Sequence, residues 1–411
     1  MIGFARDILA RLTARPDPHP ALPPSPLIRA EDRLSIPVAE RNAEGLAGLD
    51  ALKRGRHLAR QEMWAELSAE MRAADQARAA AQGGMPVAEL LALGAHSDVT
   101  LAVDHALAED VDPDDPRLVA GIRALEAVLN EHDGDPMIAL VVAQAHMEIG
   151  GAWRGTGWDA TLSQLNRERC AAHFDRAAEI LAPLLHAEPD STALASARCA
   201  LLAGCPAPDT NLADAYETLI DLDPGNPRHM RALGIHLLPR WSSSLDALEL
   251  EARRTAARTQ QIWGAAGYAW VYFDAITQDE EACARVDVAF FLDGLRDILQ
   301  RHPGQEMINL LAAYCAIALP AGLGLHEEAD LVRVQLCEAA DWLIRDHLTE
   351  LHPLIWAHAA EGFDNTARLS SPRRFAARGR ADALQALAGH FRAELRRGQH
   401  ITFTPTGLRC A

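Results

Sequence analysis

Apolar positions recur at helical spacing on both sides of a short polar segment between residues 211 and 238. The segment 223–227, Asp-Pro-Gly-Asn-Pro, should end one helix and begin another, because proline cannot continue a helix and glycine and asparagine adopt turn conformations. The residues of the two apolar faces are Tyr216, Leu219 and Ile220 before the turn, and Met230, Leu233, Leu237 and Leu238 after it. The pattern therefore predicts helix, turn, helix, and Gly234 should let another helix approach closely.

The same arrangement recurs along the chain. A helical pattern ends on two apolar residues, and a polar turn follows. One residue of that turn lies four positions after the second apolar residue. These turn residues are Asp133, Pro189, Pro224 and Pro303. The separation of 35 residues between Pro189 and Pro224 is the shortest interval in this series. The other two separations are 56 residues, between Asp133 and Pro189, and 79 residues, between Pro224 and Pro303. Recurrence with a period of about 20–50 residues is typical of repeat architectures.

This pattern resembles the tetratricopeptide repeat, a helix pair that stacks into a superhelix. The resemblance is best at 190–238 and looser over 117–362. The residues that match positions of the family pattern are Tyr216, Pro224, Leu233 and Gly234. Leu212 and Leu219 stand where the family usually has alanine, and Cys199 where it prefers glycine or alanine. The resemblance implies an all-α fold, an α-α superhelix of stacked antiparallel helix pairs that binds proteins or peptides along a concave groove.

Composition and pattern divide the chain into four regions, and helices are expected throughout the last three. They are 1–40, a short N-terminal helix and a proline-rich connector; 41–116, an N-terminal helical region; 117–362, the repeat-like region; and 363–411, a basic C-terminal capping helix and tail. Within the second region, 41–81 contains no proline and predicts one long helix, whereas 86–109 predicts two short helices that meet near Gly94.

Charge and composition exclude several classes of protein. The net charge of −18 disfavours nucleic acid as the main partner. No stretch approaches the ~20 apolar residues that a membrane-spanning helix needs. Seven cysteines without a C-x-x-C pair fit a reduced, cytoplasmic compartment. Residues 366–400 carry eight arginines against Asp382 and Glu394, which favours a polar capping helix and leaves an anion- or phospholipid-binding site as the alternative.

The sequence contains no catalytic motif of the common kinds, and it predicts neither a metal nor a cofactor. The segment 326–330, His-Glu-Glu-Ala-Asp, has Asp330 where the zinc-protease helix has its second histidine, so we interpret it as the start of a helix. The acidic segment 109–116 lacks the central glycine and closing glutamate of a calcium-binding loop, and we interpret it as a solvated turn. Five aromatic residues within 263–273 lie on both faces of a helix, which predicts core.

Two irregular segments could form a site. Residues 150–158 hold four glycines with Trp153, Arg154 and Trp158, and residues 239–244 hold Arg240 and Trp241. The tryptophans of the first segment either fill a gap between helix layers, the favoured interpretation, or line the rim of a groove. Further polar contacts are expected on the first helices of the predicted pairs, from Arg228, Arg231, Asn309 and Tyr314.

Two functions are compatible with these features. The first is a non-catalytic scaffold or adaptor that binds a protein or peptide. The alternative is a small-molecule-binding protein or enzyme with a pocket between 150–158 and 239–244. The sequence predicts no oligomeric state.

Overall fold

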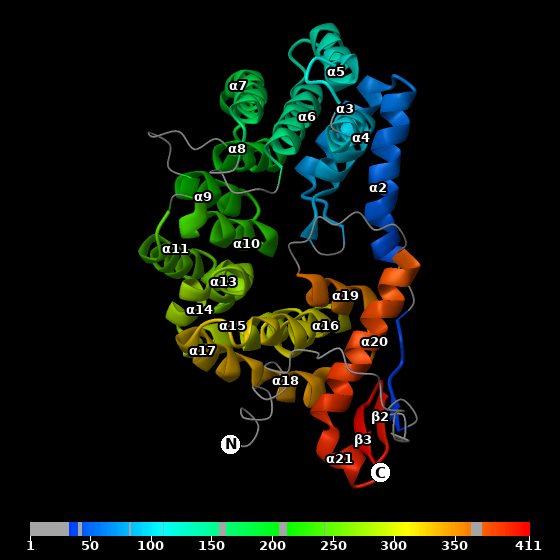
Figure 1. Cartoon of the computed structure of the whole chain (residues 1–411), viewed down its shortest axis with the longest axis vertical. Helices are drawn as coiled ribbons and strands as arrows, with labels where there is room; N and C mark the ends of the chain where they lie inside the picture. Colours follow the sequence, from blue (N-terminus) through cyan, green and yellow to red (C-terminus); the bar gives the residue numbers. More distant parts are fainter. Residues whose placement is uncertain are drawn as a thin grey trace. The chain divides into compact units, whose positions relative to one another are not determined.

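The computed structural model describes residues 33–39, 43–81, 84–109, 111–155, 162–204, 212–241, 243–362 and 372–411. These residues form an all-α fold with one small three-stranded sheet (Figure 1). The chain divides into two compact units. We call residues 41–230 the N-terminal unit, and residues 231–411 together with 1–40 the C-terminal unit. The region predicted to be repeat-like, 117–362, therefore extends into both units.

The N-terminal unit consists of helices. In chain order they are α2 (Ala43–Arg60), α3 (Trp64–Gln76), α4 (Val87–Ala108), the 3-10 turn η3 (Pro116–Leu118), α5 (Ala120–Glu131), α6 (Pro136–Arg154), α7 (Gln164–Ala187), α8 (Thr192–Gly204) and α9 (Leu212–Leu222). Helix α10 (Pro227–His236) contains the boundary between the units. Helices pack on the next helix in the chain or on the next but one, since α2 packs on α4, α4 on α6, α6 on α7 and α8 on α9.

The C-terminal unit contains the remaining helices and the sheet. The elements are η5 (Pro239–Trp241), α11 (Leu245–Arg258), α12 (Gln260–Trp263), α13 (Ala266–Gln278), α14 (Glu280–Arg285), α15 (Val288–Arg301), α16 (Gln305–Ala313), η6 (Tyr314–Ala318), η7 (Pro320–Gly322), α17 (Glu327–Cys337), α18 (Ala339–Trp342), η8 (Leu343–His347), α19 (Pro353–Glu361), α20 (Pro372–His390) and α21 (Arg392–Arg396), with strands β1 (Leu34–Ser35), β2 (Ile401–Thr404) and β3 (Gly407–Cys410). Of the short elements, η6 and η8 are π-helical, and η5 and η7 are 3-10 turns.

All four predicted turns join two helices. They separate α5 from α6, α7 from α8, α9 from α10 and α15 from α16. The apolar residues predicted on both sides of the 223–227 turn are all buried. The turn itself is fixed by Asn226, which is 6% exposed and whose Nδ2 donates to the Gly84 carbonyl at 2.9 Å. The helix, turn, helix prediction for this segment is confirmed.

Glycines allow some helices to approach at backbone distance, and Gly234 and Gly94 are two examples. A Cβ on Gly234 would lie 1.7 Å from the carbonyl oxygen of Val271 in α13, which confirms the close approach expected there. A Cβ on Gly94 would lie 2.0 Å from the carbonyl oxygen of Leu52 in α2. The prediction that Gly94 divides 86–109 into two helices is therefore wrong. Helix α4 continues through this glycine, which serves helix packing instead.

The prediction of one long helix over 41–81 is also wrong. The chain leaves α2 after Arg60 and enters α3 at Trp64. Glu62 between them adopts the left-handed conformation, with φ of 56°. The residues between the two helices include no glycine or proline that would indicate this break. Leu58 in α2 and Leu67 in α3 are both fully buried in the same core, and the turn between the helices lets both be covered.

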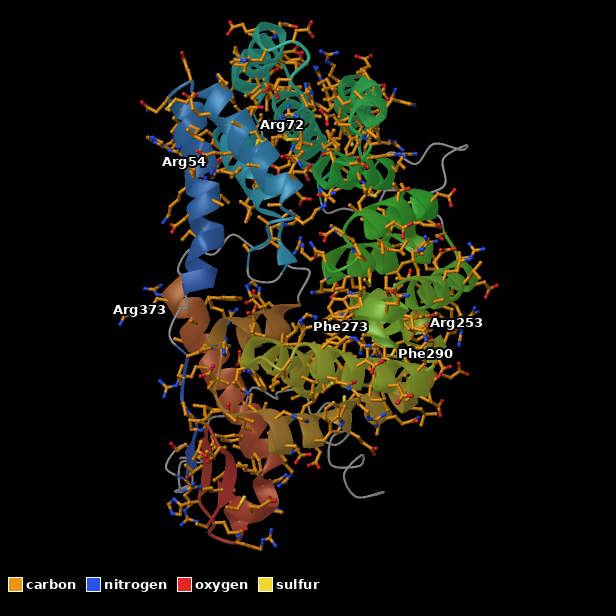
Figure 2. All side chains as sticks on the ribbon, turned by 180° about the vertical axis from the view of Figure 1, so that it is seen from behind. Arg54, Arg72, Arg253, Phe273, Phe290 and Arg373 are labelled. Carbon is orange, nitrogen blue, oxygen red and sulfur yellow. The ribbon has the colours of Figure 1, made fainter. Side chains whose placement is uncertain are left out.

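Helix α13 lies in the core of the C-terminal unit. The five aromatic residues of 263–273 are each exposed by 1% or less, which confirms the core prediction. Arg253 of α11 covers part of this cluster from outside, lying 5.6 Å from the ring centroids of Tyr268 and of Phe290 in α15 (Figure 2). Phe273 stacks on Tyr314 of η6 with ring centroids 3.9 Å apart.

The C-terminal region differs from the expected helix and tail. The basic segment forms α20 and α21, and three of its apolar residues, Phe375, Leu387 and Phe391, are buried. The residues after it, predicted only as a tail, form the antiparallel hairpin of β2 and β3. Strand β1, from the end of the proline-rich connector, pairs with β2 in parallel. The alternation of buried Ile401 and Phe403 with half-buried threonines is a strand pattern, too short to be recognised by itself.

Within the described residues, the helices are too short or too polar to cross a lipid bilayer.

Candidate functional site

Arg240 and Trp241 form a surface pair at the end of η5. Trp241 is half-buried and Arg240 is exposed. The guanidinium carbon of Arg240 lies 5.5 Å from the centroid of the Trp241 ring. Its Nη2 also donates to Oε1 of Gln278, the last residue of α13. The arginine is therefore held over the indole by a second contact, and the pair presents an aromatic ring and a cation side by side.

A histidine of helix α10 supports this pair. His236 packs edge-on against the Trp241 ring, with centroids 5.9 Å apart and planes at 73°. Burial lowers the pKa of His236 to about 4, and the nearby Arg240 charge acts in the same direction. The imidazole is accordingly neutral near pH 7, and it serves as an apolar support for the indole. The chain turns here because Pro239 ends the helical path and Ser244 caps α11 by accepting from the Ala247 N–H at 3.1 Å.

Arg231 lies deeper in the C-terminal unit. Its Nε and Nη2 donate to the two carboxylate oxygens of Asp274 at 2.7 and 2.8 Å. The guanidinium lies 5.0 Å from the centroid of the Phe273 ring, on which Tyr314 stacks. The structure thus brings the predicted residues Arg231 and Tyr314 to the same aromatic cluster. The Arg231 side chain is only 18% exposed, so it fixes α10 against α13.

Asn309 and Tyr314 were predicted to offer polar contacts on a surface, but the structure buries both completely. The Tyr314 hydroxyl donates to the Phe273 carbonyl at 2.6 Å. The Asn309 amide donates to the carbonyls of Gln305 and Glu350 and accepts from the His352 N–H and the Trp356 indole. A polar residue can occupy a core position when its hydrogen bonds are satisfied, which the sequence pattern could not reveal here.

The glycine-rich segment is not a loop over its described part. Residues 150–154 continue α6, and Gly155 ends the helix with φ of 64°. Trp153 is 5% exposed and packs within the N-terminal unit, which agrees with the favoured interpretation that it fills a gap between helices. The guanidinium carbon of Arg169 lies 6.0 Å from the centroid of its ring. Arg154 is half-buried in the last turn of α6. Trp158 and Ser242 lie outside the described residues.

Arg228 belongs to the N-terminal unit, at the start of α10. Its backbone N–H donates to the Asn226 side chain at 3.2 Å, and its side chain lies beside Gly84. Trp153, Arg154 and Arg228 are therefore in one unit, and Arg231, Arg240 and Trp241 are in the other.

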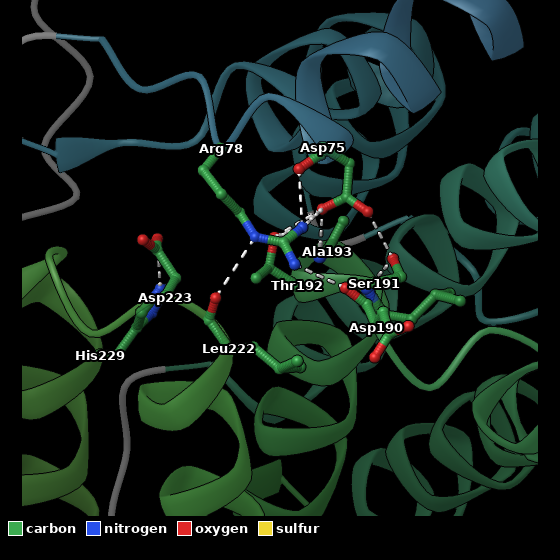
Figure 3. A network of polar contacts seen from close by, with 10 residues as sticks. Asp75, Arg78, Asp190, Ser191, Thr192, Ala193, Leu222, Asp223 and His229 are labelled. Atoms are coloured by element: carbon green, nitrogen blue, oxygen red, sulfur yellow. Dashed lines mark hydrogen bonds and ion pairs between the residues drawn. The ribbon is translucent and has the colours of Figure 1, made fainter. Parts of the chain in front are cut away.

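A polar network of the N-terminal unit was not predicted (Figure 3). The Asp75 carboxylate, 6% exposed, accepts from the hydroxyls of Ser191 and Thr192 at 2.7 and 2.5 Å and from the Ala193 N–H at 2.9 Å. These donors are at the beginning of α8, so an acid of α3 caps a helix far along the chain. The sequence feature that could have indicated this contact is Asp75 itself, an acid in the last turn of α3, where the helix dipole disfavours negative charge.

Arg78 completes this network, as Figure 3 shows. Its guanidinium donates to the carbonyls of Asp75, Asp190 and Leu222 at 2.8, 2.7 and 3.3 Å. Its backbone takes the left-handed conformation, with φ of 51°. Beside it, the His229 ring lies 3.2 Å from Asp223. Burial acts to raise the pKa of Asp223, but the hydrogen bonds from His229 and Asn226 outweigh it, and the pKa is lowered. The donors and acceptors satisfy each other, so the network holds helices together.

Two hollows lie near this network. One of about 40 Å³ is lined by Glu188, Ser191, Arg198 and Thr218 among others, and one of about 10 Å³ by Asp75 and Arg78 among others. Small-molecule pockets are typically hundreds of Å³. These two hollows have room for a few water molecules.

A second titratable cluster lies between α5, α6 and α7. The Nδ1 atoms of His146 and His173 are 2.9 Å apart, and His146 Nε2 lies 2.9 Å from Glu126. Arg176 donates to both oxygens of Glu126 at 2.8 and 2.7 Å and thereby lowers the pKa of this carboxyl. The sequence could not indicate this cluster because the packing of the helices brings its members together.

In the part of the chain that the structure describes, no three histidine, cysteine or acidic side chains are grouped so that they could hold a metal ion. His326 precedes α17 and its Nδ1 accepts from the Ala329 N–H at 3.3 Å, which confirms that this segment is a helix start. The acidic segment 109–116 lies in the connection between α4 and α5, and the described residue Asp114 is 90% exposed.

Compared with models of protein families, with curated proteins and with solved structures, the chain gives no match.

Proposed function

We propose that the chain is a non-catalytic helical-repeat scaffold that binds a protein or peptide partner, with Arg240 and Trp241 in the binding surface. The observation that carries this proposal is the Arg240–Trp241 pair itself. Arginine and tryptophan are the residues most enriched among those that dominate binding energy in protein interfaces. Here the exposed Arg240 lies over the half-buried Trp241 ring, and Gln278 and His236 hold the pair before any partner arrives. Pre-organisation of this kind lowers the entropy lost on binding.

The architecture supports the same proposal. Helices here pack on helices close to them in the chain, and turns of similar pattern join them. The tetratricopeptide repeat builds extended binding surfaces from packing of this kind. The cytoplasm is the proposed location, because the cysteines in the described residues are free and four of them, Cys170, Cys199, Cys283 and Cys315, are buried.

The test is affinity capture with the full chain from extracts of the native cell, followed by mass spectrometry of bound proteins and released small molecules. The variants Arg240→Ala and Trp241→Ala should each reduce a stoichiometric partner by about tenfold or more. Circular dichroism and the unfolding midpoint of each variant show whether it is folded.

The chain offers matched controls. Trp342 is also a half-buried tryptophan with a histidine edge-on to its ring, His347 at 5.7 Å. Arg285 is also an exposed arginine of the C-terminal unit, paired with Asp246. Trp342→Ala and Arg285→Ala should leave capture unchanged. Equal losses in the test and control variants, or a bound small molecule without a protein partner, would overturn the proposal.

A further inference from the structure

The small sheet of the C-terminal unit has one buried face and one face directed away from the core. Leu34, Ile401 and Phe403 are exposed by 6% or less and lie on the inner face. Side chains alternate between the faces of a strand, so Ser35 and Thr402, which are opposite each other in the register, lie on the outer face. The outer face is thus polar and carries hydroxyl groups.

Two arginines, one on each outer strand, belong to this outer face. Arg409 of β3 is paired directly with Thr402, so the two side chains share a face. Arg33 precedes the inward-facing Leu34, and its carbonyl accepts from the Ile401 N–H at 2.8 Å, which continues the pairing of β1 with β2. The Arg33 guanidinium lies beside Gly398, where a Cβ would be 3.5 Å from Nη1. Arg396 and Arg397, both exposed, lie at the end of α21 immediately before this glycine.

Negative charge near this face is sparse among the described residues. The stretches 33–39 and 395–411 contain no aspartate or glutamate. Glu394 of α21 is bound to Arg345 at 2.9 Å. Asp346, on η8 at the side of β3, is exposed. The surface formed by Arg33, Arg396, Arg397 and Arg409 is therefore basic in a chain whose net charge is −18.

We infer that this surface, the basic sheet face, binds an acidic peptide segment of a protein partner. Guanidinium groups bind carboxylates through two parallel hydrogen bonds, and the threonine and serine hydroxyls add donors between them. Arg33 and Arg409 are on strands two positions apart, about 10 Å across the sheet, and the register offsets them by two residues along the strands, so their backbone positions are about 12 Å apart. Carboxylates four residues apart in an extended peptide lie on the same face and span about 13 Å. The fitting segment has acidic residues at that spacing.

An acidic peptide fits better than an anionic membrane. A membrane would bring a continuous negative surface against a chain with a net charge of −18. A short peptide meets only the basic sheet face, because at physiological salt charges beyond about 8 Å are largely screened. The inference rests on the proposed function in one respect, that the partner is a protein, and it adds a second contact surface to the Arg240–Trp241 pair.

The experiment titrates the full chain into a fluorescein-labelled peptide of alternating aspartate and glutamate and follows fluorescence anisotropy. A peptide of alternating asparagine and glutamine is the ligand control. Arg33→Gln/Arg409→Gln should weaken binding about tenfold or more. Arg33→Lys/Arg409→Lys keeps the positive charge but lacks the planar guanidinium, so this variant should retain part of the binding. Added salt should weaken binding by the unmodified chain.

The matched control is Arg373→Gln/Arg380→Gln. Both arginines are exposed on α20 of the same unit, and Arg373 is labelled in Figure 2. This variant removes the same charge and should bind within about twofold of the unmodified chain. No binding of the acidic peptide, equal loss in both double variants, or binding only to vesicles of phosphatidylserine and phosphatidylcholine would overturn the inference. Those results would leave the Trp241-dependent capture experiment unaffected, so the two proposals fail separately.

Discussion

His146 and His173 face each other through their Nδ1 atoms at 2.9 Å, between α6 and α7. Glu126 is ionised by its pairing with Arg176, so it accepts from Nε2–H of His146. The neutral His146 ring then has only a lone pair at Nδ1, and His173 must donate its Nδ1 proton to it. The two rings can share this bond only while at least one facing nitrogen is unprotonated.

Acid should therefore destabilise the N-terminal unit. Burial lowers the pKa of His173 and of His96 to about 4, and it also lowers the pKa of His146. The unfolded chain, with histidine pKa near the usual 6.5, binds more protons between about pH 6.5 and 4. The free energy of unfolding is thus highest above pH 6.5 and decreases as the pH falls toward 4. His96, 1% exposed, should alone account for about 2 kcal/mol of loss by pH 5. Urea denaturation at pH 7 and pH 5 measures the loss, and equal stability at both would contradict it.

A variant can separate the histidine pair from the other histidines. His173→Asn places an amide donor near the position of Nδ1, so it can still donate to His146 but cannot be protonated. The difference in unfolding free energy between pH 7 and pH 5 should become smaller than in the unmodified chain. His400→Asn, at an exposed position, serves as control and should leave that difference unchanged. An unaltered pH dependence in His173→Asn would show that the pair does not titrate as argued.

Gly94→Ala should destabilise the N-terminal unit. The added methyl group would lie 2.0 Å from the Leu52 carbonyl oxygen, and helix α2 would have to move away. Overpacking of this kind costs about 1–3 kcal/mol. Gly151→Ala is the matched control, because Gly151 is also inside a helix but has no atom within 4 Å of the added Cβ. It should stabilise α6 by about 0.5–1 kcal/mol, since alanine is the better helix former. Thermal unfolding of both variants checks the opposite signs.

Asp75→Ala should detach the start of α8 from α3. The substitution removes the acceptor of two hydroxyls and one backbone N–H, all of them buried. Unpaired buried donors cost about 1–3 kcal/mol each, although the hydroxyls can rotate toward other acceptors, so about 2–4 kcal/mol is expected in total. Asp75→Asn keeps one acceptor oxygen and should lose less. A loss for Asp75→Ala as small as that for Asp50→Ala, which removes an exposed acid of α2, would contradict the capping role.

The sequence predicted those elements whose signals are local. The turn at 223–227 has proline, glycine and asparagine in sequence, and the apolar faces around it are buried as expected. The break at Glu62 has no such signal, because it is imposed by the burial of Leu58 and Leu67. The hairpin of β2 and β3 is too short for a pattern of period two to be distinguished from the end of a helix.

The candidate site was predicted in part for the same reason. Arg240 and Trp241 follow Pro239, which begins the 3-10 turn after α10, and a turn position is usually accessible. Asn309 and Arg231 were assigned to a surface from the polarity of their side chains, but their partners are at Glu350, Trp356 and Asp274, far along the chain. Only the packing of the helices determines that such residues are inside.

Asn309→Ala tests how much this interior network stabilises the C-terminal unit. The variant leaves the Glu350 carbonyl, the His352 N–H and the Trp356 indole N–H without their partner, in a region that excludes water. A loss of about 3–5 kcal/mol is expected, because each unsatisfied buried group costs about 1–3 kcal/mol and a small cavity remains. Gln335→Ala is the control, since Gln335 is exposed and bonds only to a carbonyl of its own helix at 3.2 Å. Urea denaturation should separate the two variants clearly. A loss below about 1 kcal/mol for Asn309→Ala would mean that water or a shift of α19 satisfies these groups, and that the asparagine does not fix α16 to α19.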